Sequence, residues 1–435
     1  MFSEKVICLN YFLMDNVKHI VVIGAGFGGL QAVKKLSKDR NLKISLIDRT
    51  NHHLFQPLLY QVATAVLSPA DIAIPSRSLT DYMKNVTVIM DEVTAIDKKS
   101  KQVILGERKL SYDYLIIAAG SHTGYFGHNE WKQYSTGLKN LTDALEIRKR
   151  LLMSFEEAEN NPQNAGNLMK YVIIGGGPTG VELAGSIAEL SHFIIRKDFR
   201  NIDTSKAEII LIEGGADLLP SFNRELSVYT KRKLEQRGVI VMLNTRVLNI
   251  EDKKVFIRSF EGEKSIEANI IIWAAGVESV TFENNSDIKS DRQKRLGVNQ
   301  FCSFDDYPDV YAIGDISSFN GEDGKPLPGV SPVAMQQGRY VASAIISEIK
   351  GKPRKPFKYF FKGSMATIGR KDAVAEFKSV RLTGFLAWLS WLFIHLIYQV
   401  GFKNKVSILI TWIWSYITFG AGARVIQEPI RRKKE

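Results

Sequence analysis

A glycine-rich turn near the start of this 435-residue chain, Gly24–Gly29, limits its fold more than any other feature. The run at 19–23, rich in β-branched residues, predicts a buried strand before the turn, and residues 30–37 favour a helix after it. Asp48 ends the next predicted strand, 24 residues after Gly24. This spacing is typical of a dinucleotide-binding βαβ unit, in which a pyrophosphate meets the helix N-terminus and the acid binds a ribose. We therefore predict an α/β fold with a nucleotide site, rather than an ordinary glycine-rich turn.

The same pattern recurs 151 residues further along the chain. A strand-like run at 171–174 leads into Gly175–Gly180, and Glu213 ends the following predicted strand, 38 residues after Gly175. The longer spacing predicts a crossover extended by about a dozen residues around 193–204. Two complete fingerprints indicate one bound cofactor and one exchanging nucleotide, an arrangement suited to electron transfer.

Three more predicted strands end in residues that suit a cofactor. Two hydrophobic runs end in the small-residue turns Ala118–Gly120 and Ala274–Gly276, which leave space for a bound molecule. The run at 310–313 ends in Gly314 and Asp315, and this carboxylate could hold a ribityl chain. Asp315 could equally cap a turn or a helix, so it carries weight only beside the two fingerprints.

Cysteine and histidine usage excludes several other kinds of site. Cys8 and Cys302 form no CxxC pair, so we expect no disulfide scaffold, cysteine zinc site or thiol–disulfide motif. This low cysteine usage favours a reducing compartment. The 7 histidines form no HxxxH-type pair or Cys/His cluster, so no metal site is predicted. Residues 1–13 show no signal or transit peptide, and Met14 could be the true start.

Positive charge is concentrated at the C-terminal end. The net charge is +12, and residues 352–435 contain 16 Lys or Arg against 4 Asp or Glu, so the rest of the chain sums to zero. The same segment holds four of the six tryptophans. Indole rings and cationic side chains both suit the headgroup region of an anionic lipid surface. We therefore expect this end to bind a membrane, and we expect no nucleic-acid binding.

Two uncharged stretches in this segment, 382–402 and 406–423, reach the length of about 20 residues that a spanning helix needs. A spanning hairpin would carry the turn Lys403–Lys405 to the far side, against the bias that keeps Lys and Arg on the cytoplasmic side. Two helices lying in the interface satisfy that bias, so we favour them over a hairpin, and part of this surface could also serve a core or a dimer. The tryptophans expected to dip toward the acyl chains are Trp388, Trp391, Trp412 and Trp414.

Taken in order, these motifs resemble those of the two-dinucleotide-binding-domain flavoproteins, the glutathione-reductase-like group, over roughly residues 15–345. Within that group, the segments His52–Ala63 and Ser331–Gly338, together with the membrane-type C-terminus, are similar to the type II NADH dehydrogenases. These are single-chain NADH:quinone oxidoreductases that do not pump protons. The family commonly has Ala-Gln where this chain has Ser331-Pro332, which removes one quinone-facing amide.

The resemblance implies two Rossmann-like dinucleotide-binding domains and a C-terminal membrane-attachment region of amphipathic or apolar helices. We expect a discontinuous FAD-binding domain at 15–145 and 296–350, an NADH-binding domain at 166–295 and the membrane-anchoring region at 351–435. The residues expected to bind FAD are Gly24, Ala25, Gly26, Phe27, Gly28, Gly29, Asp48, Arg49, Gln61, Val93, Ala119, Gly120, Asp315 and Ala334. Those expected to bind NADH are Gly175, Gly177, Pro178, Thr179, Gly180, Glu182, Glu213, Ala275 and Gly276.

The implied reaction passes a hydride from NADH to tightly bound FAD and then two electrons to a membrane quinone, ubiquinone or menaquinone. The catalytic residues carried over are Glu182, Gln336 and Gln337, although Glu182 could also be an ordinary acid stabilised by the helix dipole. Glu213 would bind a free 2′-hydroxyl and repel a 2′-phosphate, which favours NADH over NADPH. His52 and His53 are expected to be structural or near the flavin, rather than general bases. The enzyme is expected to be a homodimer on the cytoplasmic side of a bacterial-type inner membrane.

Two other functions share this architecture. A sulfide:quinone oxidoreductase needs a cysteine pair beside the flavin to carry sulfur, and neither Cys8 nor Cys302 has a partner in the sequence. An apoptosis-inducing-factor-like protein would use NADH-dependent flavin reduction as a switch for partner binding, but such proteins typically lack a Trp-rich tail. Fast quinone reduction would distinguish an enzyme from such a switch.

Overall fold

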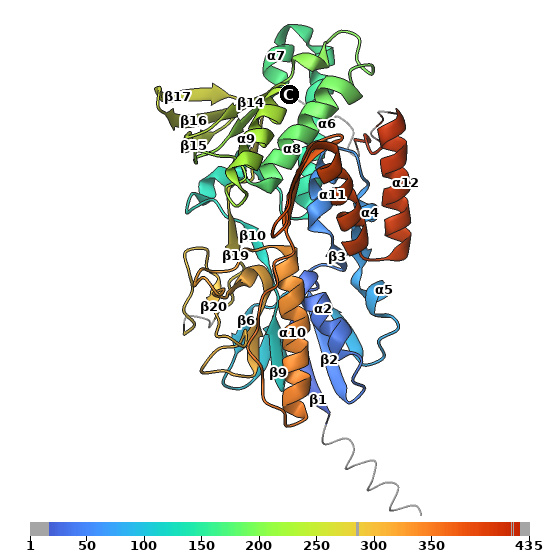
Figure 1. Ribbon diagram of the computed structural model, residues 1–435, viewed down its shortest axis with the longest axis vertical. Helices are drawn as coiled ribbons and strands as arrows, with labels where there is room; N and C mark the ends of the chain where they lie inside the picture. Colours follow the sequence, from blue (N-terminus) through green and yellow to red (C-terminus); the bar gives the residue numbers. More distant parts are fainter. Residues whose placement is uncertain (1–16, 284–286, 419, 421, 427–435) are drawn as a thin grey trace, which may run out of the picture. The chain divides into compact units, whose positions relative to one another are not determined.

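The computed structural model describes residues 17–283, 287–418, 420 and 422–426. The predictions on Cys8, Met14 and the last basic residues therefore lie outside the described residues. The chain divides into two compact units, whose elements are labelled in Figure 1. The first unit comprises Met1–His53, Ile74–His122 and Val277–Phe360, and the second comprises Leu54–Ala73, Thr123–Gly276 and Phe361–Glu435.

A five-stranded parallel sheet forms the centre of the first unit. Its strands lie in the order β21 (Val310–Ala312), β9 (Tyr114–Ile117), β1 (Lys18–Ile23), β2 (Leu42–Asp48) and β5 (Val86–Met90). The continuous apolar runs of the central strands are explained by burial on both faces, since Val22 faces one core and Val21 the other. The predicted parallel α/β arrangement is confirmed.

Helices cover one face of this sheet and a small antiparallel sheet covers the other. α2 (Phe27–Leu36) and α10 (Ser331–Ile349) lie side by side in the first unit (Figure 1). They approach closely because Gly338 has no side chain: a Cβ there would lie 2.2 Å from the carbonyl oxygen of Gly28. The opposite face is covered by β6 (Ala95–Asp97), β7 (Gln102–Leu105) and β8 (Arg108–Ser111). The shorter elements are α5 (Ser76–Thr80), β19 (Val277–Ser279), β20 (Leu296–Gly297), η6 (Gly314–Ile316) and β22 (Ser317–Ser318).

The second unit repeats the plan. Its parallel sheet has the order β11 (Thr136–Gly137), β18 (Ile270–Trp273), β12 (Lys170–Ile174), β13 (Glu208–Ile212) and β14 (Val239–Met242). α8 (Pro178–Glu189) follows β12 and continues into the π-helical turn η4 (Leu190–Ile194) and then, after a loop, the 3₁₀ turn η5 (Thr204–Lys206). The predicted extension of this crossover is therefore confirmed.

Further elements complete the second unit around this sheet. The antiparallel strands β15 (Arg246–Glu251), β16 (Lys254–Ser259) and β17 (Gly262–Glu267) form a separate small sheet. The helices are η1 (Gln56–Leu58), α3 (Leu59–Ala63), α4 (Pro69–Ile72), η2 (Asn129–Gln133), α6 (Leu141–Asn160), η3 (Pro162–Asn164), α7 (Ala165–Leu168) and α9 (Arg224–Glu235). The chain passes between the units at β3 (His52–Leu54), β4 (Ala73–Pro75) and β10 (Ser121–Thr123).

The C-terminal segment folds onto the second unit. It contains β23 (Ser364–Gly369), β24 (Asp372–Glu376), β25 (Arg381–Thr383), α11 (Gly384–Tyr398) and α12 (Phe402–Thr418). β23 packs directly on α8, because a Cβ on Gly185 would lie 1.9 Å from the carbonyl oxygen of Ile368. The boundaries of the three domains expected from the sequence stay a prediction.

The turn between the last two helices lies earlier than expected. Lys403, Asn404 and Lys405 belong to the first turn of α12, and the reversal occurs at Gln399–Gly401, where Gly401 has a φ of 82°. Lys405 Nζ donates to the carbonyl oxygen of Ile397 at 2.8 Å, which satisfies the end of α11. Within the described ranges, no helix is both long and apolar enough to cross a membrane.

The tryptophans of this segment correct a second expectation. Trp388, Trp391 and Trp412 are buried within the second unit, and only Trp414, 67% exposed, could dip into lipid. Trp391 stacks on His395 with 4.0 Å between ring centroids, and Trp388 meets Tyr416 at 4.8 Å. Trp391 also meets Tyr60 of α3 at 6.3 Å between centroids, and Trp412 donates to Gln61 of α3, so these buried rings hold α11 and α12 to the unit.

Candidate functional site

The first glycine-rich loop, between β1 and α2, has the backbone shape of a phosphate-binding turn. Gly24 has a φ of 101°, and a Cβ there would lie 2.3 Å from the carbonyl oxygen of Ala118. A Cβ on Gly29 would lie 1.9 Å from the carbonyl oxygen of Gly24, so helix and strand can meet only at glycines. Gly26, the N-cap of α2, offers no side chain to the free N–H groups. These donors and the helix dipole form an anion site.

Asp48, at the end of β2, holds this loop in place. Its Oδ2 accepts a hydrogen bond of 2.6 Å from the backbone N–H of Ala25. Its Oδ1 accepts from the backbone N–H and the hydroxyl of Thr50, both at 2.7 Å. The carboxylate is therefore fixed beside the loop, where the ribose of a bound dinucleotide would meet it.

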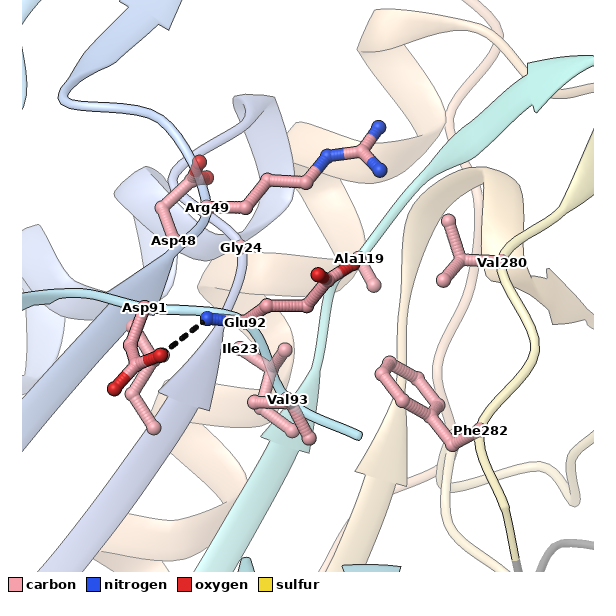
Figure 2. Close-up of a pocket in the computed structure, with 11 residues that line it drawn as sticks. Ile23, Gly24, Asp48, Arg49, Asp91, Glu92, Val93, Ala119, Val280 and Phe282 are labelled. Atoms are coloured by element: carbon pink, nitrogen blue, oxygen red, sulfur yellow. Dashed lines mark hydrogen bonds between the residues drawn. The ribbon is translucent and has the colours of Figure 1, made fainter. Parts of the chain in front are cut away.

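Figure 2 shows a pocket beside this loop, formed by residues of the first unit. Its lining comprises Ile23, Gly24, Ile47, Asp48, Arg49, Asp91, Glu92, Val93, Ala119, Val280 and Phe282. The predicted FAD-binding residues Gly24, Asp48, Arg49, Val93 and Ala119 therefore meet here. Glu92 was not predicted as a site residue, although it follows the end of a parallel strand, where such sites form. Phe282 lies in a segment without any periodic pattern, so no local signal pointed to it.

His53 touches the same loop from within the first unit. Its Nδ1 lies 2.8 Å from the carbonyl oxygen of Ala25, and burial lowers the pKa of the ring to about 4. The imidazole is therefore neutral near pH 7, and Nδ1 carries the proton that it donates to Ala25. Its Nε2 is a buried acceptor without a partner among the described residues. A hydroxyl of a dinucleotide cofactor is a donor of the right kind, so the residues present fit such a group.

Asp315 and Gln337 meet after β21. Ser121 donates to Asp315 Oδ2 at 2.7 Å. Gln337 is 0% exposed, and its Oε1 accepts a hydrogen bond of 2.7 Å from the backbone N–H of Gly314. Gln337 was expected among the catalytic residues, and that role stays a prediction. α10 presents it to the turn after β21, where it positions Gly314 and Asp315.

Gln336 and Ala334 lie on the same helix with different surroundings. Gln336 is half-buried; its Nε2 donates to the carbonyl oxygen of Phe360 at 2.9 Å, and its Oε1 accepts from the N–H of Phe360 at 3.0 Å. This pair fixes the amide and leaves one Nε2 hydrogen. Ala334 is buried. A Cβ on Gly314 would lie 3.1 Å from the Cβ of Ala334, so the two positions leave space only for small residues.

The second loop, between β12 and α8, has the same backbone. Gly175 has a φ of 112°, and a Cβ on Gly180 would lie 1.8 Å from its carbonyl oxygen. Gly177 leaves the N-terminus of α8 uncapped, and Pro178 and Thr179 are exposed beside it.

Glu213 does for this loop what Asp48 does for the first. Its Oε2 accepts from the N–H of Gly176 and its Oε1 from the N–H of Gly215, both at 2.6 Å. A Cβ on Gly175 would lie 2.7 Å from Cα of Ala275, so the turn after β18 adjoins the loop. The predicted NADH-binding residues in the loop and in this turn, together with Glu213, therefore lie at one edge of the sheet.

Glu182 lies one turn further along α8. Burial raises the pKa of its carboxyl to about 8. The backbone N–H of Thr367, 3.4 Å away, lowers this pKa but offsets only part of the shift. The carboxyl is therefore mostly protonated at pH 7. An acid stabilised by the helix dipole would be ionised, so this environment favours the functional interpretation over the alternative.

Gln61 lies in a buried polar network of the second unit. Its Nε2 donates to the hydroxyl of Tyr60 at 3.0 Å, and its Oε1 accepts from Nε1 of Trp412 at 2.8 Å. The Tyr60 hydroxyl also lies 3.0 Å from Oγ1 of Thr367. We expected the Gln61 amide to bind FAD. Its buried partners tie α3 to α12, and its contact with FAD stays a prediction.

Comparisons with known proteins agree over most of the chain. The pyridine nucleotide-disulphide oxidoreductase family matches residues 18–338, and the NDH2 C-terminal domain matches 361–420. The type II NADH:quinone oxidoreductase Ndh of Mycobacterium tuberculosis is 39% identical over 94% of this chain and 90% of its own length. The type II NADH:quinone oxidoreductase of Staphylococcus haemolyticus is 29% identical over 84% of this chain and 91% of its own. The structure of NDH2 from Plasmodium falciparum in complex with NADH has a TM-score of 0.85 at 22% identity, covering 93% of this chain and 99% of that one.

Proposed function

This chain belongs to the pyridine nucleotide-disulphide oxidoreductases and, within them, to the type II NADH:quinone oxidoreductases, and on that premise we propose which residues serve the reaction. The enzyme transfers electrons from NADH through FAD to a quinone. When bound, FAD supplies the acceptor for the hydride and the donor for the quinone. One observation carries the residue assignment: in each unit the acid of the second strand accepts an N–H of the glycine-rich loop.

The first unit binds FAD. The uncapped start of α2 and the loop Gly24–Gly29 hold the pyrophosphate, and Asp48 accepts hydrogen bonds from the adenosine ribose. The pocket beside Arg49 and Val93 encloses the adenosine end. Asp315, oriented by Ser121, accepts from the ribityl chain.

The second unit binds NADH at the loop Gly175–Gly180. The N–H groups at the start of α8 hold the pyrophosphate, and Glu213 accepts from the adenosine ribose. A 2′-phosphate at that ribose would meet the Glu213 carboxylate, and the two negative charges would repel each other. We therefore assign NADH, rather than NADPH, as the substrate.

Glu182 holds a proton for the second half-reaction. Reducing a quinone to a quinol takes up two protons as well as two electrons. Glu182 of α8 contacts the backbone N–H of Thr367 in β23, and that amide cannot release a proton near pH 7. The Glu182 carboxyl can, because burial raises its pKa to about 8. Gln336 keeps its proposed place near the quinone, whereas Gln337 acts by positioning the Gly314 turn.

α11 and α12 attach the enzyme to a lipid surface on the cytoplasmic side of the membrane, as a peripheral homodimer. Each helix packs one face on the protein and presents apolar side chains to solvent on the other, and helices with such an exposed apolar face lie in the membrane interface. Those exposed on α11 are Phe385, Leu386, Leu389, Phe393 and Ile397, and those on α12 are Phe402, Val406, Leu409, Ile410, Ile413, Trp414 and Ile417. Lys403 is exposed among them and suits anionic headgroups.

NADH oxidation by the FAD-loaded protein in liposomes tests this function. We expect strong turnover with NADH that depends on a short-chain quinone, and weak turnover with NADPH. Flavin that is reduced by NADH but not reoxidised by quinone would contradict the acceptor and favour a redox switch. Sulfide-dependent quinone reduction is not expected, because Cys302 is buried and is the single free cysteine of the described chain.

A further inference from the structure

An aromatic residue next to the NADH-binding sheet has no role in the assignment above. Tyr125–His128 forms a tight turn, in which the N–H of His128 donates to the carbonyl oxygen of Tyr125 at 3.0 Å. Its two central residues are left-handed, with a φ of 53° at Phe126 and 94° at Gly127. Turns of this type favour Asn, Asp or Gly at the first central position, so Phe126 is locally disfavoured there.

The surrounding contacts impose this conformation. Nε1 of Trp273 donates to the carbonyl oxygen of Gly124 at 2.8 Å, and the N–H of Gly124 donates to the carbonyl oxygen of Gly276 at 3.1 Å. Tyr125 is buried, with its ring centroid 5.4 Å from that of Trp273. The turn is therefore fixed to the end of β18, and Phe126 is held in strain by its neighbours.

The Phe126 ring gains little from its own burial. It is 65% exposed, and it meets Trp273 only edgewise at 5.8 Å between centroids. It covers the turn after β18, since a Cβ on Gly276 would lie 2.8 Å from the ring. An exposed aromatic ring on a strained backbone is the kind of feature that is found at ligand contacts.

The strand order places the nicotinamide half of NADH at this turn. β13, which Glu213 follows directly, lies on one side of β12, and β18 lies on the other. With the adenosine ribose at Glu213 and the pyrophosphate at Gly175–Gly180, the other half of the dinucleotide extends over the end of β18. That end is the turn Ala274–Gly276, which Phe126 covers.

We propose that Phe126 binds the nicotinamide half of NADH through its aromatic face. The inference rests on the NADH site proposed above and adds a residue to it. Contact between this aromatic ring and the nicotinamide ring explains why Phe occupies a position that suits Asn or Gly.

Equilibrium binding of NAD⁺ and of ADP-ribose to FAD-loaded Phe126→Asn tests the proposal, because ADP-ribose lacks only the nicotinamide. We expect about tenfold weaker binding of NAD⁺, unchanged binding of ADP-ribose and an unchanged KM for quinone. The Tm should stay the same or rise, since Asn tolerates the left-handed turn. Phe126→Tyr should bind NAD⁺ as the wild type does. Phe260→Asn is the matched control, because Phe260 is 91% exposed in the turn between β16 and β17.

Unchanged NAD⁺ binding by Phe126→Asn would overturn the proposal. Equal weakening of NAD⁺ and ADP-ribose, or a lower Tm with NAD⁺ binding restored at low temperature, would assign Phe126 a structural role instead. Failure of the NADH site itself has a different signature, because the wild-type protein would then bind neither ligand.

Discussion

The two glycine-rich loops share one backbone but differ in what surrounds them. In each unit an acid from the second strand accepts a loop N–H at 2.6 Å, Asp48 from Ala25 and Glu213 from Gly176. In the first unit α10 packs on α2, and a pocket of mixed apolar and charged residues adjoins the loop. In the second, Pro178 and Thr179 at the start of α8 are exposed.

This difference matches a cofactor that stays and a nucleotide that exchanges. Both loops are partly exposed, at Gly26 in the first and at Pro178 and Thr179 in the second. However, α10 packs on α2 at Gly28, in its first turn, whereas β23 packs on α8 at Gly185, about two turns from its start, so the first loop should hold its ligand longer. The second unit also carries the helices proposed to meet lipid. The local fingerprint therefore sets what is bound, and the covering elements set how long it stays.

The largest effect should come from removing one glycine from each loop. Gly29→Ala should abolish flavin retention, because its Cβ would lie 1.9 Å from the carbonyl oxygen of Gly24. Gly180→Ala, with its Cβ 1.8 Å from the carbonyl oxygen of Gly175, should keep flavin but lose its reduction by NADH. Flavin absorbance before and after NADH addition measures both. Gly166→Ala, where a Cβ meets nothing within 4 Å, is the control, and flavin loss in Gly180→Ala would break the comparison.

Glu182→Gln should lower kcat with quinone by about a hundredfold, because the amide cannot release a proton. The wild-type kcat should fall as the pH rises through about 8, the value to which burial raises the pKa of Glu182, and the variant should lack this break. The pKa of Glu182 is raised from 4.5 to about 8, so the folded state binds this proton more tightly than the unfolded state. The resulting contribution to the free energy of unfolding is complete below pH 4.5 and is lost as the pH rises toward 8. The pH dependence of Tm should therefore flatten in the variant. A wild-type pH profile in Glu182→Gln would show that this carboxyl carries no proton for the reaction.

Glu213→Gln should reduce the preference for NADH over NADPH by about tenfold, because it removes the charge that repels a 2′-phosphate. The ratio of kcat/KM for the two nucleotides measures this. Asp48→Asn is the matched change in the other unit and should weaken FAD retention without altering the ratio. An altered ratio in Asp48→Asn would mean that the two loops do not serve separate nucleotides.

The smallest effect is expected from replacing tryptophans of the C-terminal helices, where an exposed ring on α12 is compared with a buried ring on α11. Trp414→Ala should weaken binding to anionic liposomes by about fivefold and leave the Tm unchanged, because that ring packs on little of the protein. Trp388→Ala should lower stability by about 3 kcal/mol, since its ring is buried against Tyr416. Vesicle co-sedimentation and thermal melting measure the two. Equal lipid affinity of Trp414→Ala and wild type would argue against lipid contact at this ring.

The sequence by itself determined both nucleotide loops, the acids that follow them and the order of the strand-end motifs. Each of these depends on backbone geometry over a short stretch, such as the positive φ of Gly24 and Gly175 or the spacing from glycine to acid. Such features can be predicted without knowing what packs around them, because a phosphate-binding turn requires the same residues in any surroundings.

Only the tertiary structure decided which side chains of a known element reach the site. Neighbouring residues on a helix point about 100° apart, so Gln336 and Gln337 cannot face the same partner, but the contact of Gly338 with Gly28 decides which one is buried. In the same way, the partners of Gln61, the burial of Trp391 and the strain at Phe126 depend on distant segments. Burial raises the pKa of Glu182, and the N–H that partly offsets this shift belongs to Thr367 of β23, 185 residues further along the chain. Burial is set by contacts remote in sequence, and no local pattern encodes them.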